Sequence, residues 1–195
     1  AHKKGYMIPP GLSFIAVSQK AWDAAERSNL PKFYLDLKSY RKSLLSNSNP
    51  YTPAVNLIFA LDEALKMMRE EGLDNIFKRH NKHKLAMSNA AKALSLKLFA
   101  DEKYLSPSIT AIKTEKIDAE EFRKTIKNKF DILLAGGQDH LKGKIFRVGH
   151  LGYVSDRDIV TVISAISKAL FDLGEITAQQ AGEALVVATK YLEAG

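Results

Sequence analysis

The feature that constrains this chain most is the stretch after Lys4, in which Pro9–Gly11 precedes the apolar run Leu12–Ser18. The two prolines fix φ and lack a backbone donor, and glycine permits conformations closed to other residues. The stretch therefore predicts a rigid turn that leads into a short buried strand. A lysine held beside a core is desolvated, which lowers the amine pKa and suits Schiff-base chemistry. The alternative is a solvated charge near a terminus.

The composition indicates a globular chain of one domain, or of one domain and part of another. It has 195 residues, of which 46% are hydrophobic, enough to build a core. No run reaches the roughly 18 apolar residues of a membrane span, and the first residues lack a signal-peptide pattern. The absence of cysteine excludes disulfides, thiol catalysis and cysteine-ligated metals. These features predict a cytoplasmic protein without membrane contact.

A formal net charge of +7 favours anionic ligands, and the basic run Lys78–Lys84 is the densest cluster of positive charge. A nucleic-acid site is not expected there, because no aromatic residue is interleaved for stacking. A metal site at His80 and His83 lacks a third ligand nearby, so no metal is expected. We interpret the run as a solvated helix face.

Hydrophobic periodicity predicts two successive helices in the middle of the chain. Apolar residues at helical spacing run from Val55 to Glu71, where Gly72 marks the end. A second stripe extends from Leu73 to about Phe99 and predicts one long helix that connects two domains. The predicted domains are residues 1–72 and 73–195.

The remaining residues alternate between strand and helix patterns. Strands are predicted at Ser108–Lys113, Asp131–Ala135 and Lys144–Val148. Helices are predicted to begin at the capping sequences Asp118–Glu121, Ser155–Asp158 and Thr177–Gln180, with Gly174 ending the second of them. These elements predict an α+β domain in which helices cover a small sheet.

Two polar residues in these elements have structural and functional interpretations. Thr52 precedes Pro53, a pair that often caps a helix, and a helix N-terminus also suits a phosphate. Arg147 lies in the centre of a predicted strand, on the face opposite Phe146 and Val148, where a charge needs a partner. That partner is a carboxylate such as Asp131 or Asp156, or else a ligand.

The first residues resemble a known family. Lys4–Leu12, followed by Val17–Trp22, is similar to the class V group of fold-type-I pyridoxal-phosphate aminotransferases, which includes the alanine-glyoxylate and serine-pyruvate aminotransferases. In that family a Ser-Gln-Lys tripeptide carries the cofactor lysine shortly before Pro-Pro-Gly. This register implies that Lys4 is the cofactor lysine, although positions 2 and 3 carry His and Lys. Lys20, in a literal Ser-Gln-Lys, follows the predicted strand and is excluded by the same register.

Two further segments carry the resemblance. Gly143–Gly152 is similar to the family motif Gly-Lys-x-Phe-Arg-(Ile/Val)-Gly-x-(Leu/Met)-Gly, whose arginine binds the substrate α-carboxylate. The resemblance thus implies this role for Arg147, and a bidentate guanidinium suits it. Ser43–Pro53 resembles the family's Thr-Pro segment, which implies that Thr52 contacts the cofactor phosphate across a dimer interface.

The resemblance implies an α/β fold that consists of the end of the family's large domain and a small α+β domain, joined by a long helix. It implies pyridoxal 5'-phosphate as cofactor and transfer of an amino group from alanine or serine to glyoxylate or pyruvate. The family places most of its cofactor-binding sheet before the lysine. We therefore expect a homodimer, or association with a missing amino-terminal half, and no activity of this chain alone. The alternative is a non-catalytic assembly subunit, because cyanobacterial relatives carry soluble-hydrogenase names.

Overall fold

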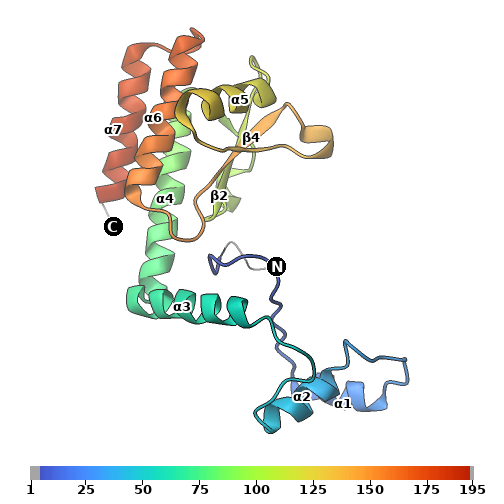
Figure 1. Cartoon of the computed structure of the whole chain (residues 1–195). Helices are drawn as coiled ribbons and strands as arrows, with labels where there is room; N and C mark the ends of the chain where they lie inside the picture. The colour runs from blue at the N-terminus through green and yellow to red at the C-terminus, as the bar shows by residue number, and fades with distance from the viewer. Residues whose placement is uncertain (1–4, 194–195) are drawn as a thin grey trace. The chain divides into compact units, whose positions relative to one another are not determined.

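The structure is a computed structural model that describes residues 5–193, shown in Figure 1. The chain divides into two compact units, Ala1–Lys66 and Met67–Gly195. The division falls inside helix α3 (Val55–Glu71), whereas the sequence predicted a boundary after this helix, at residue 72. The predicted division into domains stays a prediction.

The first unit holds helix α1 (Gln19–Arg27), helix α2 (Leu37–Leu45) and most of α3. Each short helix has a side-chain cap: Ser18 accepts from the Ala21 amide, and Asp36 accepts from the Lys38 amide. These caps fix where α1 and α2 begin. The predicted helix from Val55 to Glu71 is confirmed.

The prediction of a buried strand at Leu12–Ser18 is wrong. These residues form no strand, and the side chains of Phe14 and Ile15 are 49% and 67% exposed. The physical reason is the lack of a pairing partner, since the structure describes no strand between residues 5 and 66. An extended segment without a neighbouring strand has no ladder to join.

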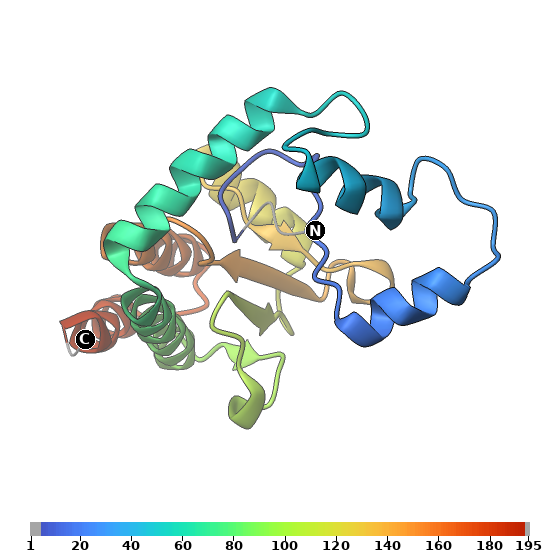
Figure 2. The same cartoon turned by 90° about the horizontal axis from the view of Figure 1, so that it is seen from below.

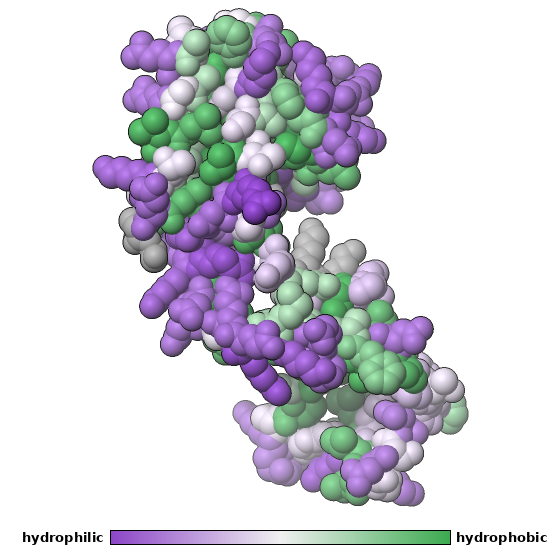
Figure 3. Space-filling view, turned by 60° about the vertical axis from the view of Figure 1, so that its left-hand side comes forward, coloured by the Kyte–Doolittle hydropathy of each residue, from purple (hydrophilic) through white to green (hydrophobic). Residues whose placement is uncertain are grey.

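Hydrophobic side chains remain exposed across the first unit, and they colour parts of its surface green in Figure 3. Phe33, Leu35 and Leu45 are each 81% exposed, and Leu44 is 74% exposed. Figure 3 also shows purple, hydrophilic side chains among the green areas of this unit. Exposed apolar surface of this extent is typical of a surface that another polypeptide covers.

Four α-helices follow in the second unit: α4 (Leu73–Ala93), α5 (Ala119–Phe130), α6 (Asp156–Asp172) and α7 (Ala178–Glu193). Two short 3-10 helices, η1 (Glu102–Tyr104) and η2 (Asp139–Leu141), lie between them. Figures 1 and 2 show α4, α6 and α7 packed side by side. Among residues 5–193, no helix combines the length and apolar character that a membrane crossing requires.

Helix α4 is shorter than the sequence predicted, since it ends at Ala93 instead of continuing to Phe99. Ser95 adopts a positive φ of 58°, a left-handed conformation that interrupts the helix and turns the chain toward strand β1 (Lys97–Leu98). The apolar residues after Ala93 keep the helical spacing although the chain turns at Ser95, so the spacing alone predicted too long a helix.

Within residues 5–193 the sheet has four strands in the order β1-β2-β4-β3, and every neighbouring pair is antiparallel. The two long strands are β2 (Ile109–Lys113) and β4 (Ile145–Gly149), which confirm two of the predicted strands. The third prediction, Asp131–Ala135, is wrong in extent, because β3 consists of Ala135–Gly136. Asp131 instead takes a left-handed conformation at the end of α5.

One face of this sheet packs against the helices. Ile112 of β2 lies opposite Phe146 of β4, and both are fully buried in a hydrophobic cluster with residues of α4, α5, α6 and α7. Val148 belongs to the same cluster. Because side chains alternate along a strand, Arg147 lies on the opposite face. The sequence predicted this alternation, and the structure confirms it.

The predicted caps of the last two helices are also confirmed. Ser155 and Asp158 form a reciprocal capping box at the start of α6. Thr177 accepts from the Gln180 amide, and the Gln180 side chain accepts from the Thr177 amide at the start of α7. Gly174 has a φ of 71° just after α6, as a helix-ending glycine requires.

Replacing Phe146 by alanine tests where the core of the second unit lies. Phe146 is fully buried, and its ring centroid is 5.2 Å from that of Phe122. Loss of the ring leaves a cavity, so we expect the free energy of unfolding to fall by about 3–5 kcal/mol. Val186→Ala is the control, because Val186 is 69% exposed. Denaturant unfolding followed by circular dichroism measures both, and equal stabilities would contradict this core assignment.

Candidate functional site

The three predicted site residues have different positions in the molecule. Lys4 lies outside the described residues. Thr52 belongs to the first unit and Arg147 to the second, so each is described within its own unit. The structure therefore gives a separate environment for each of these two residues.

Thr52 is exposed and lies three residues before the start of α3. Its hydroxyl makes no hydrogen bond to any described residue, so the interpretation of Thr52 as a helix cap is wrong. The neighbouring Tyr51 is anchored, because its hydroxyl donates to the Phe33 carbonyl at 3.1 Å and its ring centroid is 4.5 Å from that of Tyr34. The chain beside Thr52 is thus held in place while the threonine hydroxyl stays available.

Arg147 lies in the middle of β4, between Ala111 of β2 and Ala135 of β3. Its side chain is partly buried, and its Nε donates to the Gly136 carbonyl at 2.9 Å. This bond fixes one edge of the guanidinium. Its two terminal nitrogens make no hydrogen bond to any residue from 5 to 193.

The structural interpretation of Arg147 as half of an ion pair is wrong for the described chain. No carboxylate between residues 5 and 193 lies within ion-pair distance of it. Asp156 binds Lys82 and His83 instead, and Asp131 ends α5. A partly buried guanidinium with two free terminal nitrogens is suited to bidentate recognition of a carboxylate ligand.

A set of polar residues on α4 contradicts the prediction of a solvated basic face. Arg79, Lys82 and Lys84 are partly buried, whereas His80 and His83 are 8% and 0% exposed. The composition of this run indicated positive charge and led to the prediction of a solvated face, so the burial of the two histidines was not predicted. The contacts of these residues show why they are buried.

Arg79 joins the end of α3 to the chain that leaves β4. Its Nε and Nη2 bind the two carboxylate oxygens of Glu71 at 2.5 and 2.9 Å. Its Nη1 donates to the carbonyls of Gly152 and Val154 at 2.8 and 3.1 Å. The hydrogen bonds from Arg79 lower the pKa of Glu71. Arg79 therefore links the end of α3 to the connection between β4 and α6.

His80 contributes to the same connection. Its Nδ1 donates to the Ile76 carbonyl at 2.7 Å, because a carbonyl can only accept. Its Nε2 is then the acceptor for the Gly152 amide at 3.2 Å. These two bonds link α4 to the chain that follows β4.

Asp156, the first residue of α6, receives two further groups from α4. His83 Nε2 donates to Oδ1 at 2.8 Å, and Lys82 Nζ donates to Oδ2 at 2.9 Å. Burial lowers the pKa of His83, although the bond to Asp156 opposes this effect. Burial acts to raise the pKa of Asp156, but the bonds from Lys82 and His83 outweigh it and the pKa is lowered.

His150 fixes the end of β4 from the other side. It is fully buried, with Nδ1 donating to the Pro107 carbonyl at 3.0 Å and Nε2 accepting from the Thr110 hydroxyl at 2.9 Å. Burial lowers the pKa of His150 to about 4. Sequence reasoning missed this role, although the histidine lies inside the motif that contains Arg147.

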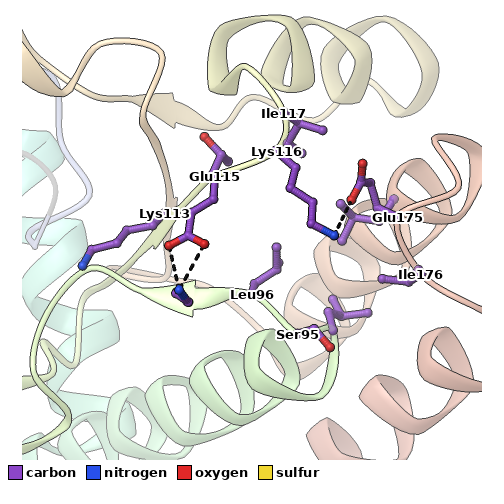
Figure 4. A pocket seen from close by; sticks show the side chains of 12 residues that line it. Ser95, Leu96, Lys113, Glu115, Lys116, Ile117, Glu175 and Ile176 are labelled. Atoms are coloured by element: carbon purple, nitrogen blue, oxygen red, sulfur yellow. Dashed lines mark hydrogen bonds and ion pairs between the residues drawn. The ribbon is translucent and has the colours of Figure 1, made fainter.

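A cavity of about 110 Å³ lies at the ends of α4 and α6, and none of the predicted site residues lines it. Figure 4 shows the side chains that do. Its floor is apolar and includes Leu94 and Ile176. Its charged rim is paired: Lys97 binds Glu115 at 2.8 Å, and Lys116 lies 3.7 Å from Glu175. These two pairs neutralise their four charges, and Lys113, the remaining charged residue of the lining, lies over the Phe99 ring.

No family model matches the chain. Among curated proteins, it is 55% identical over 172 residues to the "Soluble hydrogenase, small subunit" of a Synechococcus strain, a match that covers 88% of this chain and 45% of the relative. It is 34% identical over 198 residues to the serine–glyoxylate aminotransferase of Methylorubrum extorquens, covering 97% of this chain and 48% of the relative.

A solved structure of similar fold is the ureidoglycine–glyoxylate aminotransferase of Bacillus subtilis. It matches with a TM-score of 0.85 and 28% identity over 97% of this chain and 50% of that protein. The chain thus spans about half the length of the proteins it matches, and it corresponds to their carboxy-terminal portion. The resemblance to class V pyridoxal-phosphate aminotransferases predicted from the sequence is confirmed.

The buried His150 predicts a loss of stability in acid. The imidazole of the unfolded chain, whose pKa has the ordinary value of 6.5, takes up a proton that the folded protein excludes down to a pH of about 4. The contribution is therefore complete above pH 6.5 and is lost as the pH falls through this window, by up to about 3 kcal/mol. His83, whose pKa is also lowered, acts in the same direction. Denaturant unfolding of the full chain across this range measures the loss.

His150→Gln tests whether His150 causes this loss of stability, because glutamine cannot take up a proton in this range. We expect the variant to lose a large part of the pH dependence and to keep the part from His83. His140→Gln is the matched control, because His140 lies exposed in η2. Equal pH dependence in the His150 and His140 variants would contradict the assignment.

Proposed function

We propose that the chain is the carboxy-terminal part of a cytoplasmic class V pyridoxal-phosphate aminotransferase, which moves an amino group from alanine or serine to glyoxylate or pyruvate. The observation that carries the proposal is the guanidinium of Arg147. It lies in a strand centre and has two free terminal nitrogens, and no carboxylate between residues 5 and 193 pairs with it. Such a group matches the α-carboxylate shared by amino acids and keto acids.

The described residues fit the proposed cofactor at one position. The hydroxyl of Thr52 is exposed and makes no hydrogen bond to a described residue, so it can donate to a phosphate oxygen. Lys4 is the proposed covalent attachment residue. Bound pyridoxal phosphate supplies an electron sink for the carbanion that forms at the substrate Cα.

In this proposal Arg147 binds the substrate and Lys4 transfers the proton. Arg147 binds the α-carboxylate and fixes which bonds of the substrate Cα face the catalytic lysine. The amine of Lys4 would take the proton from the Cα of the amino donor, and it would later return a proton to the Cα of the keto acid that accepts the amino group. Thr52 keeps the phosphate end in place, so that the amino group stays beside Lys4.

The proposed whole enzyme needs polypeptide beyond this chain. The relatives are about twice as long, and the first unit exposes large apolar residues such as Phe33 and Leu44. We propose that residues 1–72 complete a large domain with an amino-terminal half, that residues 73–195 are the small domain, and that the assembled enzyme is a homodimer. Its small-molecule partners are an amino acid and a keto acid, with no role for nucleic acid or membrane.

Replacement of Arg147 by lysine is expected to weaken substrate binding far more than cofactor binding. Lysine keeps the positive charge and loses the planar fork, so we expect the KM for the amino donor to rise about tenfold or more. Steady-state kinetics and cofactor titration of the assembled enzyme measure the two effects. Unchanged donor kinetics would show that the arginine does not bind substrate.

The position of the cofactor can be tested on the chain mixed with the amino-terminal half of its 55% identical Synechococcus relative. We expect this chain alone to bind pyridoxal phosphate weakly and to be inactive, and the mixture to gain both properties. Borohydride reduction and peptide mapping are expected to place the pyridoxyl group on Lys4, with Lys20 as the internal control. Tight binding with turnover by the chain alone, or modification of Lys20, would overturn this account.

The second candidate function is that of a non-catalytic assembly subunit. It is favoured by the 55% identical relative named as a small subunit of a soluble hydrogenase. An absorption spectrum distinguishes the two functions, because an enzyme with bound pyridoxal phosphate absorbs near the visible range. A purified assembly that stays colourless after addition of pyridoxal phosphate would favour the subunit role.

A further inference from the structure

We infer that Arg123, on helix α5, is a positioning residue for Arg147 and acts through strand β3. The inference rests on the proposed function, because it assumes that Arg147 binds the substrate carboxylate. It concerns the bond from Arg147 Nε to the Gly136 carbonyl, which sets the direction of the guanidinium. The position of that carbonyl is in turn set from α5.

Strand β3 is too short to fix its own position. It has two residues, Ala135–Gly136, and it lies at the edge of the sheet with β4 as its one neighbour. Its ladder pairs Ala135 with Arg147 and Gly136 with Phe146, and the Gly137 amide donates to the Ile145 carbonyl at 3.2 Å. An edge strand with so few backbone bonds needs support from outside the sheet.

Arg123 supplies this support. Its Nε donates to the carbonyl of Leu134 at 2.8 Å, immediately before β3 begins. Its Nη1 donates to Glu120 Oε2 at 2.7 Å, one turn earlier on α5. The arginine is partly buried, and the pairing with Glu120 restricts its rotamer. One side chain therefore ties the start of the edge strand to a helix.

The same ion pair lies directly against Gly136. A Cβ at this position would lie 2.5 Å from Glu120 Oε1 and 2.6 Å from Arg123 Nη1. The missing side chain of Gly136 thus makes room for the pair. The Gly136 backbone lies between Arg123 and Arg147, so a displacement of Arg123 reaches the carbonyl that Arg147 binds.

This arrangement explains how a flexible arginine side chain can present a defined fork. With Nε held by Gly136, the plane of the guanidinium is fixed and the two terminal nitrogens stay free for a carboxylate. Less orientational freedom is then lost when the ligand binds. Arg123 does not touch the substrate in this scheme, since it acts through Gly136 and Arg147.

The test follows the Nε–H proton of Arg147 by nitrogen-15 NMR of the full chain, with its signal identified by its loss in Arg147→Lys. In Arg123→Gln we expect this proton to exchange with solvent about tenfold faster or more, because local opening of β3 exposes it. Arg123→Lys keeps the charge beside Glu120 and lacks the Nε donor, so it serves as a variant that folds if the glutamine variant does not. We expect faster exchange there too.

Lys124→Gln is the matched control, because Lys124 is the next residue of α5 and is exposed, with Glu121 3.9 Å away. Its exchange rate is expected to equal that of the unmodified chain. Exchange in both Arg123 variants as slow as in this control would overturn the positioning role.

The link to substrate is measured on the chain mixed with the amino-terminal half of its Synechococcus relative. Arg123→Gln is expected to raise the KM for the amino donor about five- to tenfold and to leave kcat within about twofold. Faster Nε–H exchange without a rise in KM would overturn the link between Arg123 and the substrate. A mixture in which the unmodified chain shows no transamination would instead overturn the proposed function, while the exchange rates still decide whether Arg123 positions Arg147.

Discussion

The hydrogen bond from Arg147 to the Gly136 carbonyl depends on strand β4, which contributes side chains to the core and also holds Arg147 in position. Side chains alternate along a strand, so Phe146 and Val148 enter the helix-covered core while Arg147 lies on the other face. The burial that stabilises the second unit therefore also fixes the backbone of the candidate ligand-binding residue. A change in the register of β4 by one residue would exchange these two faces and remove both properties together.

The two ends of this strand are held by different means. The Ile145 carbonyl, at its start, accepts from the Gly137 amide. At its end, His150 is bound to Pro107 and Thr110, and the following connection is bound by Arg79 and His80 of α4. These polar groups are buried or partly buried and have most of their bonds satisfied, an arrangement that rigidifies a local structure. The chain around Arg147 is consequently restrained on both sides by residues distant in sequence.

The sequence predicted the elements whose signals are local. The caps at Ser155 and Thr177, the alternation around Arg147 and the helix ending at Glu71 each depend on neighbours within one or two turns, and the structure confirms them. The missed features depend on distant partners. Burial of His83 needs Asp156, 73 positions away, and Leu12–Ser18 forms no strand without a neighbour. The roles of Lys4 and Thr52 came from resemblance and stay predictions.

The two units differ in what they bury, and this difference explains why the second unit resembles a domain while the first does not. Most buried hydrophobic residues in the second unit form one cluster that joins the sheet to helices α4–α7. Among residues 5–66, the buried hydrophobic side chains are Ile8 and Ala64, while Phe33, Leu35 and Leu45 are each 81% exposed. Burial of apolar surface is the main favourable term in folding. A segment that buries so little apolar surface against itself gains little of this favourable term on its own. This is the physical basis for the proposed association of the first unit with an amino-terminal half.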